Sequence, residues 1–195
     1  MANSFQNQAP ASHEVGSEEV TVLQLDGFIS EPKPTSTSTT PLFVSLDAFR
    51  ASGTCVYTLD AEQRRVYLPS QFIGSIHKVE VVEREYAGDY EPYTKLCLSM
   101  TVGQKLYTLF VGLNSWAGQS LLNTLGQLTE PQLHSPLLFK AVAGRRCCFF
   151  RVALDNGEGE WMSVSISDEA LGTRLNTDEL ILLANTIDET LSSTN

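Results

Sequence analysis

A strict two-residue alternation is the feature that most constrains how this chain can fold. Over residues 95–102 the even-numbered positions are all apolar: Leu96, Leu98, Met100 and Val102. The odd-numbered positions between them are less apolar. Successive side chains of a β-strand point to opposite faces, so the pattern predicts a strand with one face in a core and one face outside.

More strands and one helix are predicted on both sides of this segment. A Gly-Gln turn leads into a returning strand, after which the apolar period changes from two to the helical value. Apolar runs rich in β-branched and aromatic residues predict the remaining strands. The predicted order is strands 75–86, 95–102 and 105–113, helix 115–128, and strands 137–142 and 146–154, with an additional strand at 161–166.

Two further elements flank this block. Residues 55–59 and 65–68 are β-prone runs separated by polar residues, which predicts a hairpin. A helix is predicted from Asp178, because Asn176 and Glu179 have the spacing of a capping box. Its apolar stripe consists of Leu180, Leu183, Ala184, Ile187 and Leu191. The stripe requires a groove, either on its own domain or on a partner.

The N-terminal part of the chain has three segments of different composition. Residues 1–19 are polar and acidic, residues 20–29 are β-prone, and a linker rich in Pro, Ser and Thr follows them. The β-prone segment could pair with its own domain or add a strand to a partner's sheet. We predict a disordered acidic tail and linker over 1–40, a β-barrel domain with an N-terminal hairpin over 41–170, and a C-terminal amphipathic helix with its tail over 171–195.

Over residues 74–166 the order of elements resembles the OB-fold single-stranded DNA-binding proteins. The resemblance lies in element order and not in diagnostic motifs. It implies a mainly β chain with a few helices: an OB-like, five- to six-stranded Greek-key barrel with one helix between the third and fourth barrel strands, and a C-terminal amphipathic helix. The bacterial members end in an acidic tail with a terminal Pro-Phe, whereas this chain ends in Ser-Thr-Asn. Partner recruitment through such a tip is therefore not implied.

The distribution of charge refines the argument about partners. The formal net charge of −10 excludes a histone-like protein that coats nucleic acid with its whole surface. The net charge is −5 over residues 1–60, +2 over 61–150 and −7 over 151–195. A mildly basic middle between acidic ends fits a polyanion-binding domain, and it also fits a merely well-solvated surface.

Alternation in the last barrel strand predicts a basic and aromatic strip on the outer face. If Cys148 and Phe150 face the core, then Arg145, Phe149 and Arg151 lie on the opposite face. Cations that follow phosphates and rings that stack on bases are what single-strand binders use, although such residues are also ordinary on half-exposed sheets. With candidates from the first three barrel strands and the loop between the first two, the predicted nucleic-acid-binding set is Lys78, Arg84, Tyr86, Tyr90, Tyr93, Lys95, Lys105, Arg145, Phe149 and Arg151.

Catalytic and metal-binding motifs are absent from the sequence. His13, His77 and His134 are not accompanied by HExxH, GxSxG, GxxxxGK[ST] or a Cys/His cluster with metal-ligand spacing. We therefore expect no enzymatic activity, no cofactor and no metal site. The four cysteines lack CxxC spacing and are expected to be reduced, packed thiols. Of the adjacent pair Cys147 and Cys148, only Cys147 is expected to face outward and react readily.

The sequence supports two functions, whereas a third, the binding of a small ligand or an oligosaccharide, rests only on fold analogy. The first is a non-catalytic OB-fold module that binds single-stranded DNA or RNA, with acidic tails. The second is a protein-interaction or assembly module that contacts a partner, or a second copy in a homo-oligomer, through residues 20–29 and through Leu180, Leu183, Ile187 and Leu191. The sequence shows no secretory leader and no apolar run long enough to span a bilayer, so a cytoplasmic location without membrane contact is expected.

Overall fold

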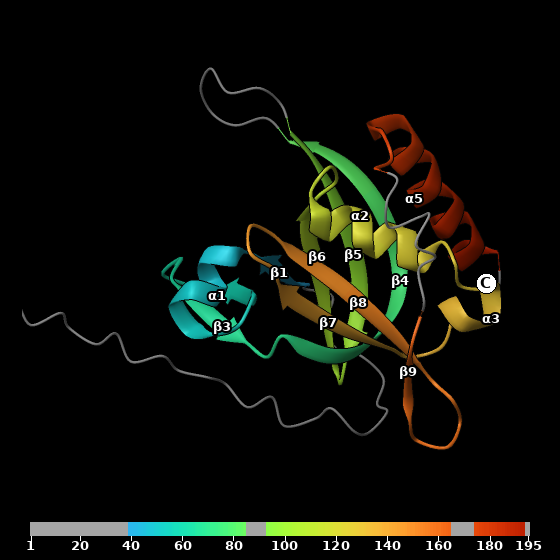
Figure 1. The fold of residues 1–195 in the computed structure, drawn as a ribbon, viewed down its shortest axis with the longest axis horizontal. Helices are drawn as coiled ribbons and strands as arrows, with labels where there is room; N and C mark the ends of the chain where they lie inside the picture. The colour runs from blue at the N-terminus through green and yellow to red at the C-terminus, as the bar shows by residue number, and fades with distance from the viewer. Residues whose placement is uncertain (1–38, 85–92, 165–173, 194–195) are drawn as a thin grey trace, which may run out of the picture.

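A single mixed β-sheet of nine strands dominates the structure (Figure 1). The computed structural model describes residues 39–84, 93–164 and 174–193. The strands are β1 (Thr40–Val44), β2 (Val56–Leu59), β3 (Arg65–Leu68), β4 (Gln71–Arg84), β5 (Tyr93–Val102), β6 (Lys105–Gly112), β7 (Leu137–Ala143), β8 (Cys148–Asp155) and β9 (Trp161–Ser163). The helices are α1 (Leu46–Ser52), α2 (Trp116–Leu125), α3 (Glu130–Leu133) and α5 (Thr177–Ser192). The chain is therefore mainly β with a few helices, as predicted.

The order of strands in the sheet is β3-β2-β1-β6-β5-β4-β7-β8-β9. All neighbouring strands are antiparallel except β1 and β6, which are parallel. The predicted hairpin is confirmed as β2 and β3, and the predicted helix lies between β6 and β7 as α2. Strand β1 and helices α1 and α3 were not predicted. The predicted β-prone segment 20–29 lies outside the described residues.

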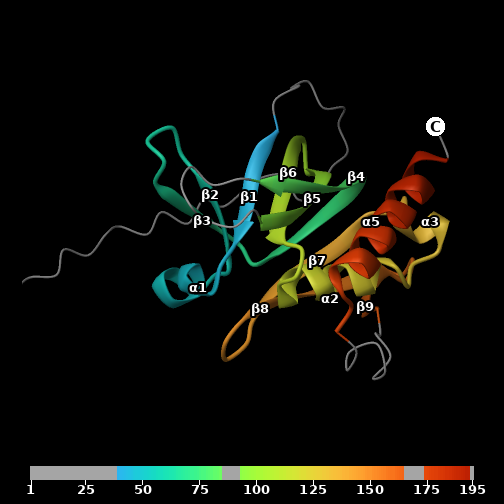
Figure 2. The ribbon, with the colours of Figure 1, turned by 90° about the horizontal axis from the view of Figure 1, so that it is seen from above.

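The long strand β4 joins the two parts of the sheet. Residues 71–74 pair with β7, whereas residues 75–84 pair with β5, with a register shift between Ile76 and Lys78. Figures 1 and 2 show that the sheet bends here, so that β7 and β8 lie on one side of the core and β1, β5 and β6 lie on the other. The outer faces of the two parts consequently point in opposite directions.

The core fills the space between these two parts. Leu98 and Leu109 enter it from β5 and β6, and Phe139 and Phe150 enter it from β7 and β8. All four side chains are almost fully buried. Burial of such apolar side chains is the main stabilising term of the fold.

Helix α2 covers part of the edge of β8. Ser115 caps the helix, its hydroxyl accepting a hydrogen bond from the Gly118 N–H at 3.1 Å. Glycine is required at position 118, because a Cβ atom there would lie 2.3 Å from the carbonyl oxygen of Gly112. One turn later the Ser120 hydroxyl accepts the Phe150 N–H at 2.8 Å. The helix therefore supplies a hydrogen-bond acceptor for the Phe150 N–H, which lies on the edge of β8 that faces away from β7.

The predicted closed barrel of five or six strands is wrong. Its closure requires the third and fifth barrel strands, here β6 and β8, to meet. Instead, the edge of β6 pairs with β1, and the corresponding edge of β8 contacts α2 and then pairs with β9. Because both edges already have other partners, the sheet stays open and extends to nine strands.

The C-terminal helix α5 packs on its own chain. Its capping box is confirmed, with Asn176 accepting the Glu179 N–H at 3.0 Å and Glu179 accepting the Asn176 N–H at 2.8 Å. The stripe residues Leu180, Ala184, Ile187 and Leu191 are buried in the core, and Leu183 packs against it. The stripe is therefore covered within the chain by β4 and α2, and a partner that bound through it would first have to displace the helix.

A hydrogen bond from the sheet also holds α5. The Asp188 carboxylate accepts the Val79 N–H of β4 at 2.8 Å. In the part of the chain that the structure describes, no helix is long and apolar enough to cross a bilayer.

Candidate nucleic-acid interface

Three strands bring an aromatic row to the outside of the sheet. Phe43 of β1 lies opposite Tyr57 of β2 and opposite Phe110 of β6. The ring centroids are 5.4 Å apart for Phe43 and Tyr57 and 5.7 Å apart for Phe43 and Phe110, with interplanar angles of 29° and 22°. The three residues alternate with buried neighbours such as Leu42 and Leu109, so their side chains point away from the core.

Cationic side chains lie at both ends of this row. The guanidinium carbon of Arg65 is 4.9 Å from the ring centroid of Tyr57. The Nζ atom of Lys95 is 4.8 Å from the ring centroid of Tyr93 and 5.9 Å from those of Phe43 and Phe110. Neither cation forms an ion pair with an acidic side chain that the structure describes. We refer to Phe43, Tyr57, Arg65, Tyr93, Lys95 and Phe110 together as the outer face.

A second basic surface lies on β7 and β8. The guanidinium carbon of Arg151 is 5.8 Å from the ring centroid of Phe149, and Lys140 lies directly opposite Arg151. Arg145 and Arg146 are exposed in the turn between the two strands. We refer to Lys140, Arg145, Arg146, Phe149 and Arg151 together as the β8 patch.

The structure places the predicted binding residues on two surfaces instead of in one groove. Tyr93 and Lys95 belong to the outer face, whereas Arg145, Phe149 and Arg151 belong to the β8 patch. The outward parity was predicted correctly for Lys95 on β5 and for Phe149 and Arg151 on β8. The bend at β4 separates the two groups, because it turns the outer faces of the two parts of the sheet away from each other.

Two further predicted residues, Lys78 and Lys105, contribute less to these surfaces. Lys78 forms an ion pair with Glu80, which neutralises its charge. Lys105 lies opposite Val102, on the parity of the core and not of the outer face. Arg84 lies opposite Tyr93 in the ladder of β4 and β5. Tyr86 and Tyr90 lie outside the described residues.

Most residues of the outer face were not predicted from the sequence. Phe110 has the outward parity of its strand, so alternation alone could have identified it. Phe43 and Tyr57 join it only because β1 pairs with β6, with Thr40 opposite Tyr107 and Phe43 opposite Phe110. No local signal in the sequence indicates this pairing between distant segments. Arg65 was read only as part of the hairpin.

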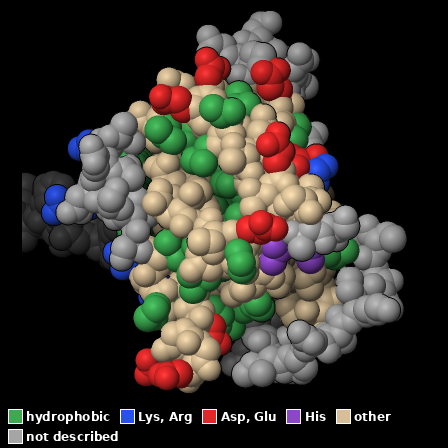
Figure 3. Space-filling view, turned by 90° about the vertical axis from the view of Figure 1, so that its right-hand side faces the viewer, with side chains coloured by type: hydrophobic (Ala, Val, Ile, Leu, Met, Phe, Trp, Pro, Cys, Tyr) green, Lys and Arg blue, Asp and Glu red, His purple; other side chains and the backbone are tan. Residues whose placement is uncertain are grey.

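Acidic side chains gather on a different side of the molecule. Asp178, Glu179, Asp188 and Glu189 lie on α5, which has no Lys or Arg. Figure 3 looks onto the side that carries α5, and the red acidic groups there predominate over the blue basic ones. A polyanion would therefore be repelled from this side.

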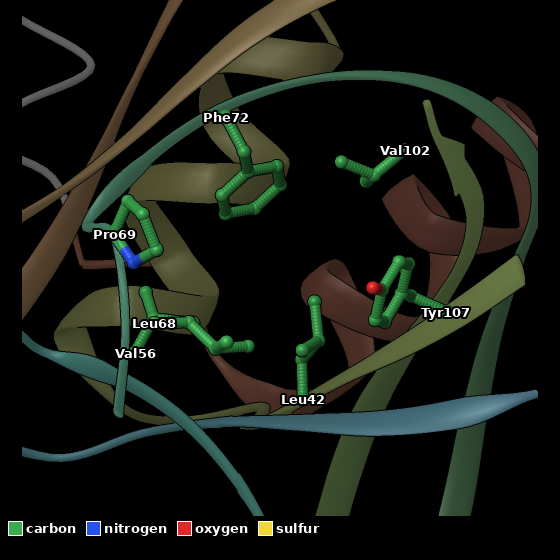
Figure 4. Close-up of a pocket in the computed structure, with 7 residues that line it drawn as sticks. All are labelled: Leu42, Val56, Leu68, Pro69, Phe72, Val102 and Tyr107. Carbon is green, nitrogen blue, oxygen red and sulfur yellow. The ribbon is translucent and has the colours of Figure 1, made fainter. Parts of the chain in front are cut away.

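A pocket that lies among the described strands is too small to be a ligand site. Its volume is about 20 Å³, close to the space that a single water molecule needs. Burial raises the pKa of the Tyr107 hydroxyl, which favours its neutral form. Figure 4 shows the lining side chains, which are Leu42, Val56, Leu68, Pro69, Phe72, Val102 and Tyr107.

Native cysteine alkylation should modify Cys147 first. Burial, together with the neighbouring Cys55 thiol, raises the pKa of Cys148 to about 12, so its reactive thiolate is scarce at neutral pH. Cys55, Cys97 and Cys148 are buried, whereas Cys147 is half-buried. Timed iodoacetamide labelling followed by peptide mass spectrometry measures the order. Equally fast labelling of Cys148 would show that the start of β8 is open to solvent.

Comparison of the chain with protein-family models, with curated proteins and with solved structures found no match. A functional inference therefore rests on the chemistry of the two basic surfaces described above.

Proposed function

We propose that this protein is a non-catalytic module that binds single-stranded nucleic acid through the outer face. The observation that carries the proposal is the row of three rings with cations beside it, Arg65 at Tyr57 and Lys95 at Phe110, neither of which is ion-paired within the described part of the chain. Single-strand binders combine these two elements, because cations attract the phosphates and ring faces stack on bases of any sequence. Each stacked base contributes about 1–3 kcal/mol of binding free energy.

The position of the outer face supports this proposal. The strands β4, β5 and β6, helix α2, and strands β7 and β8 follow one another in the order expected of an OB-like Greek-key fold. In that order β5 and β6 take the places of the second and third strands, whose face binds oligonucleotides in OB-folds. Lys95, Tyr93 and Phe110 lie on these two strands.

The ring geometry leaves room for bases. Centroid separations of 5.4 Å and 5.7 Å correspond to offset stacking, in which neighbouring rings overlap only in part. Part of each ring face is then uncovered, in line with the partial exposure of Phe43, Tyr57 and Phe110. Lys95 lies among three of the rings, where its ammonium group could hold a phosphate between neighbouring bases.

Fluorescence anisotropy with labelled single-stranded DNA and RNA of about 16 nucleotides tests the proposal. We expect saturable binding at about 50 mM salt and a linear fall of the logarithm of affinity with the logarithm of salt concentration. The absence of binding to either probe at about 50 mM salt would refute the proposal.

Replacing Lys95 and Arg65 together with glutamine should weaken this binding about tenfold or more, because a hydrogen bond to a charged group is worth about 1.5–3 kcal/mol. The salt slope should shrink by about 1.4, since each phosphate contact to a single strand contributes about 0.7. The matched control is Arg50→Gln with Arg64→Gln. These arginines are exposed but ion-paired with Asp47, Asp60 and Glu62. An equal loss of affinity in the control would show that only overall charge matters.

A protein-interaction module is the second candidate function. Tyr, Phe and Arg are enriched in protein interfaces, and the outer face contains all three residue types. Light scattering on the purified chain tests the version in which the partner is a second copy. A mass above that of one chain, lowered to one chain by Phe110→Ser, would favour this candidate.

A further inference from the structure

We infer that the β8 patch is a second contact surface for the same nucleic-acid strand, one that binds its phosphates, so that a long strand wraps from the outer face around to β8. The inference rests on the proposed function and adds a minimum ligand length to it. The patch carries four cations, Lys140, Arg145, Arg146 and Arg151, of which none forms an ion pair within the described part of the chain.

The arrangement of these cations is costly without an anion. Lys140 and Arg151 lie directly opposite each other on adjacent antiparallel strands, and like charges in that position destabilise a sheet. No Asp or Glu occurs between residues 131 and 154, so the hairpin offers no carboxylate of its own. A bound polyanion would remove the repulsion, and this gain favours an anionic ligand over an apolar one.

The chemistry of the patch is suited to phosphates more than to bases. It has one ring, Phe149, and the guanidinium of Arg151 already lies 5.8 Å from the centroid of that ring. Arginine binds phosphate through two parallel hydrogen bonds, which gives guanidinium groups an advantage at phosphate sites. The β8 patch is thus complementary to the outer face, where rings predominate.

The turn between β7 and β8 connects the two surfaces. Figures 1 and 2 both place this turn beside α1, the helix that follows β1 of the outer face. Arg145 and Arg146 are exposed in the turn. In OB-folds the loop between the fourth and fifth strands also contacts the ligand. A nucleic-acid chain that leaves the outer face at the end of β1 would therefore meet Arg145 and Arg146 before it reached Arg151.

The test compares two probe lengths on the full chain. Anisotropy is measured with labelled oligothymidylate of about 5 and about 16 nucleotides, near the limits of the site sizes of single OB-folds. The variant is Arg145→Gln with Arg146→Gln and Arg151→Gln, and the control is Arg50→Gln with Arg64→Gln, whose arginines are ion-paired elsewhere. Circular dichroism verifies that both variants are folded.

We expect the triple variant to bind the longer probe at least about tenfold more weakly, with a salt slope smaller by about 2, and to bind the shorter probe as the wild type does. An unchanged affinity for the longer probe would overturn the inference while leaving the proposed function intact. Equal losses for both probes would also overturn it, because the patch would then belong to a single small site. If the wild type binds neither probe, the proposed function fails first. Binding of polyglutamate that depends on these three arginines would, in that case, assign the patch to an acidic protein segment.

Discussion

Replacing Phe150 with alanine is expected to lower the free energy of unfolding by about 3–5 kcal/mol, the range found for large aromatic side chains in cores. Phe150 is 1% exposed and lies in β8. Its N–H donates to Ser120 of α2, so the side chain lies where the helix meets the second part of the sheet. Most domains are stable by only about 5–15 kcal/mol, so the variant would have little stability left.

The neighbouring residue supplies a matched control. Phe149→Ala removes the same side chain from the outer side of β8, where it is half-buried and contacts Arg151. A loss of about 1 kcal/mol or less is expected, since an exposed cation–π contact contributes about 0.5–1 kcal/mol. Urea denaturation followed by circular dichroism measures both variants. Equal losses, or a larger loss for Phe149→Ala, would mean that β8 is paired one residue out of the register described here.

The elements from β4 to β8, with the exception of α3, were predictable because their signals are local. Alternation in residues 95–102 and the change of period after residue 113 depend only on sequence neighbours, and the structure has β5 and α2 at these places. Closure of the barrel is not a local property. It depends on which strand occupies the open edge of β6, and the pairing of Phe43 with Phe110 that decides this links segments far apart in the chain.

In the candidate site, too, the features that depend on sequence neighbours were predictable, and those that depend on pairing between distant segments were not. Parity correctly assigned Lys95, Phe149 and Arg151 to outward faces. Alternation indicates only the face of a strand on which a side chain lies. It does not indicate where that face points in the molecule once the sheet bends. Because β4 pairs with β7 through its first residues and with β5 through the rest, the predicted single groove became two surfaces. The rings of Phe43 and Tyr57 could be placed only after β1 was located.

Leu180→Ala is the second substitution expected to have a large effect, a loss of about 2–5 kcal/mol of unfolding free energy. Leu180 is fully buried in the core at the start of α5. The helix packs on β4 and α2, and Asp188 accepts the Val79 N–H of β4. A cavity at Leu180 would therefore weaken the contact between the C-terminal helix and the sheet, and not a contact between chains.

The same helix contains the control for this substitution. Leu182 is 68% exposed, so Leu182→Ala should change the unfolding free energy by no more than about 0.5 kcal/mol. Denaturant unfolding and light scattering on both variants separate the two roles considered for the stripe. If α5 is part of the core, Leu180→Ala lowers stability and leaves the mass of the folded protein unchanged. A lowered mass with unchanged stability would instead show that Leu180 lies between two chains, contrary to the packing of α5 on β4.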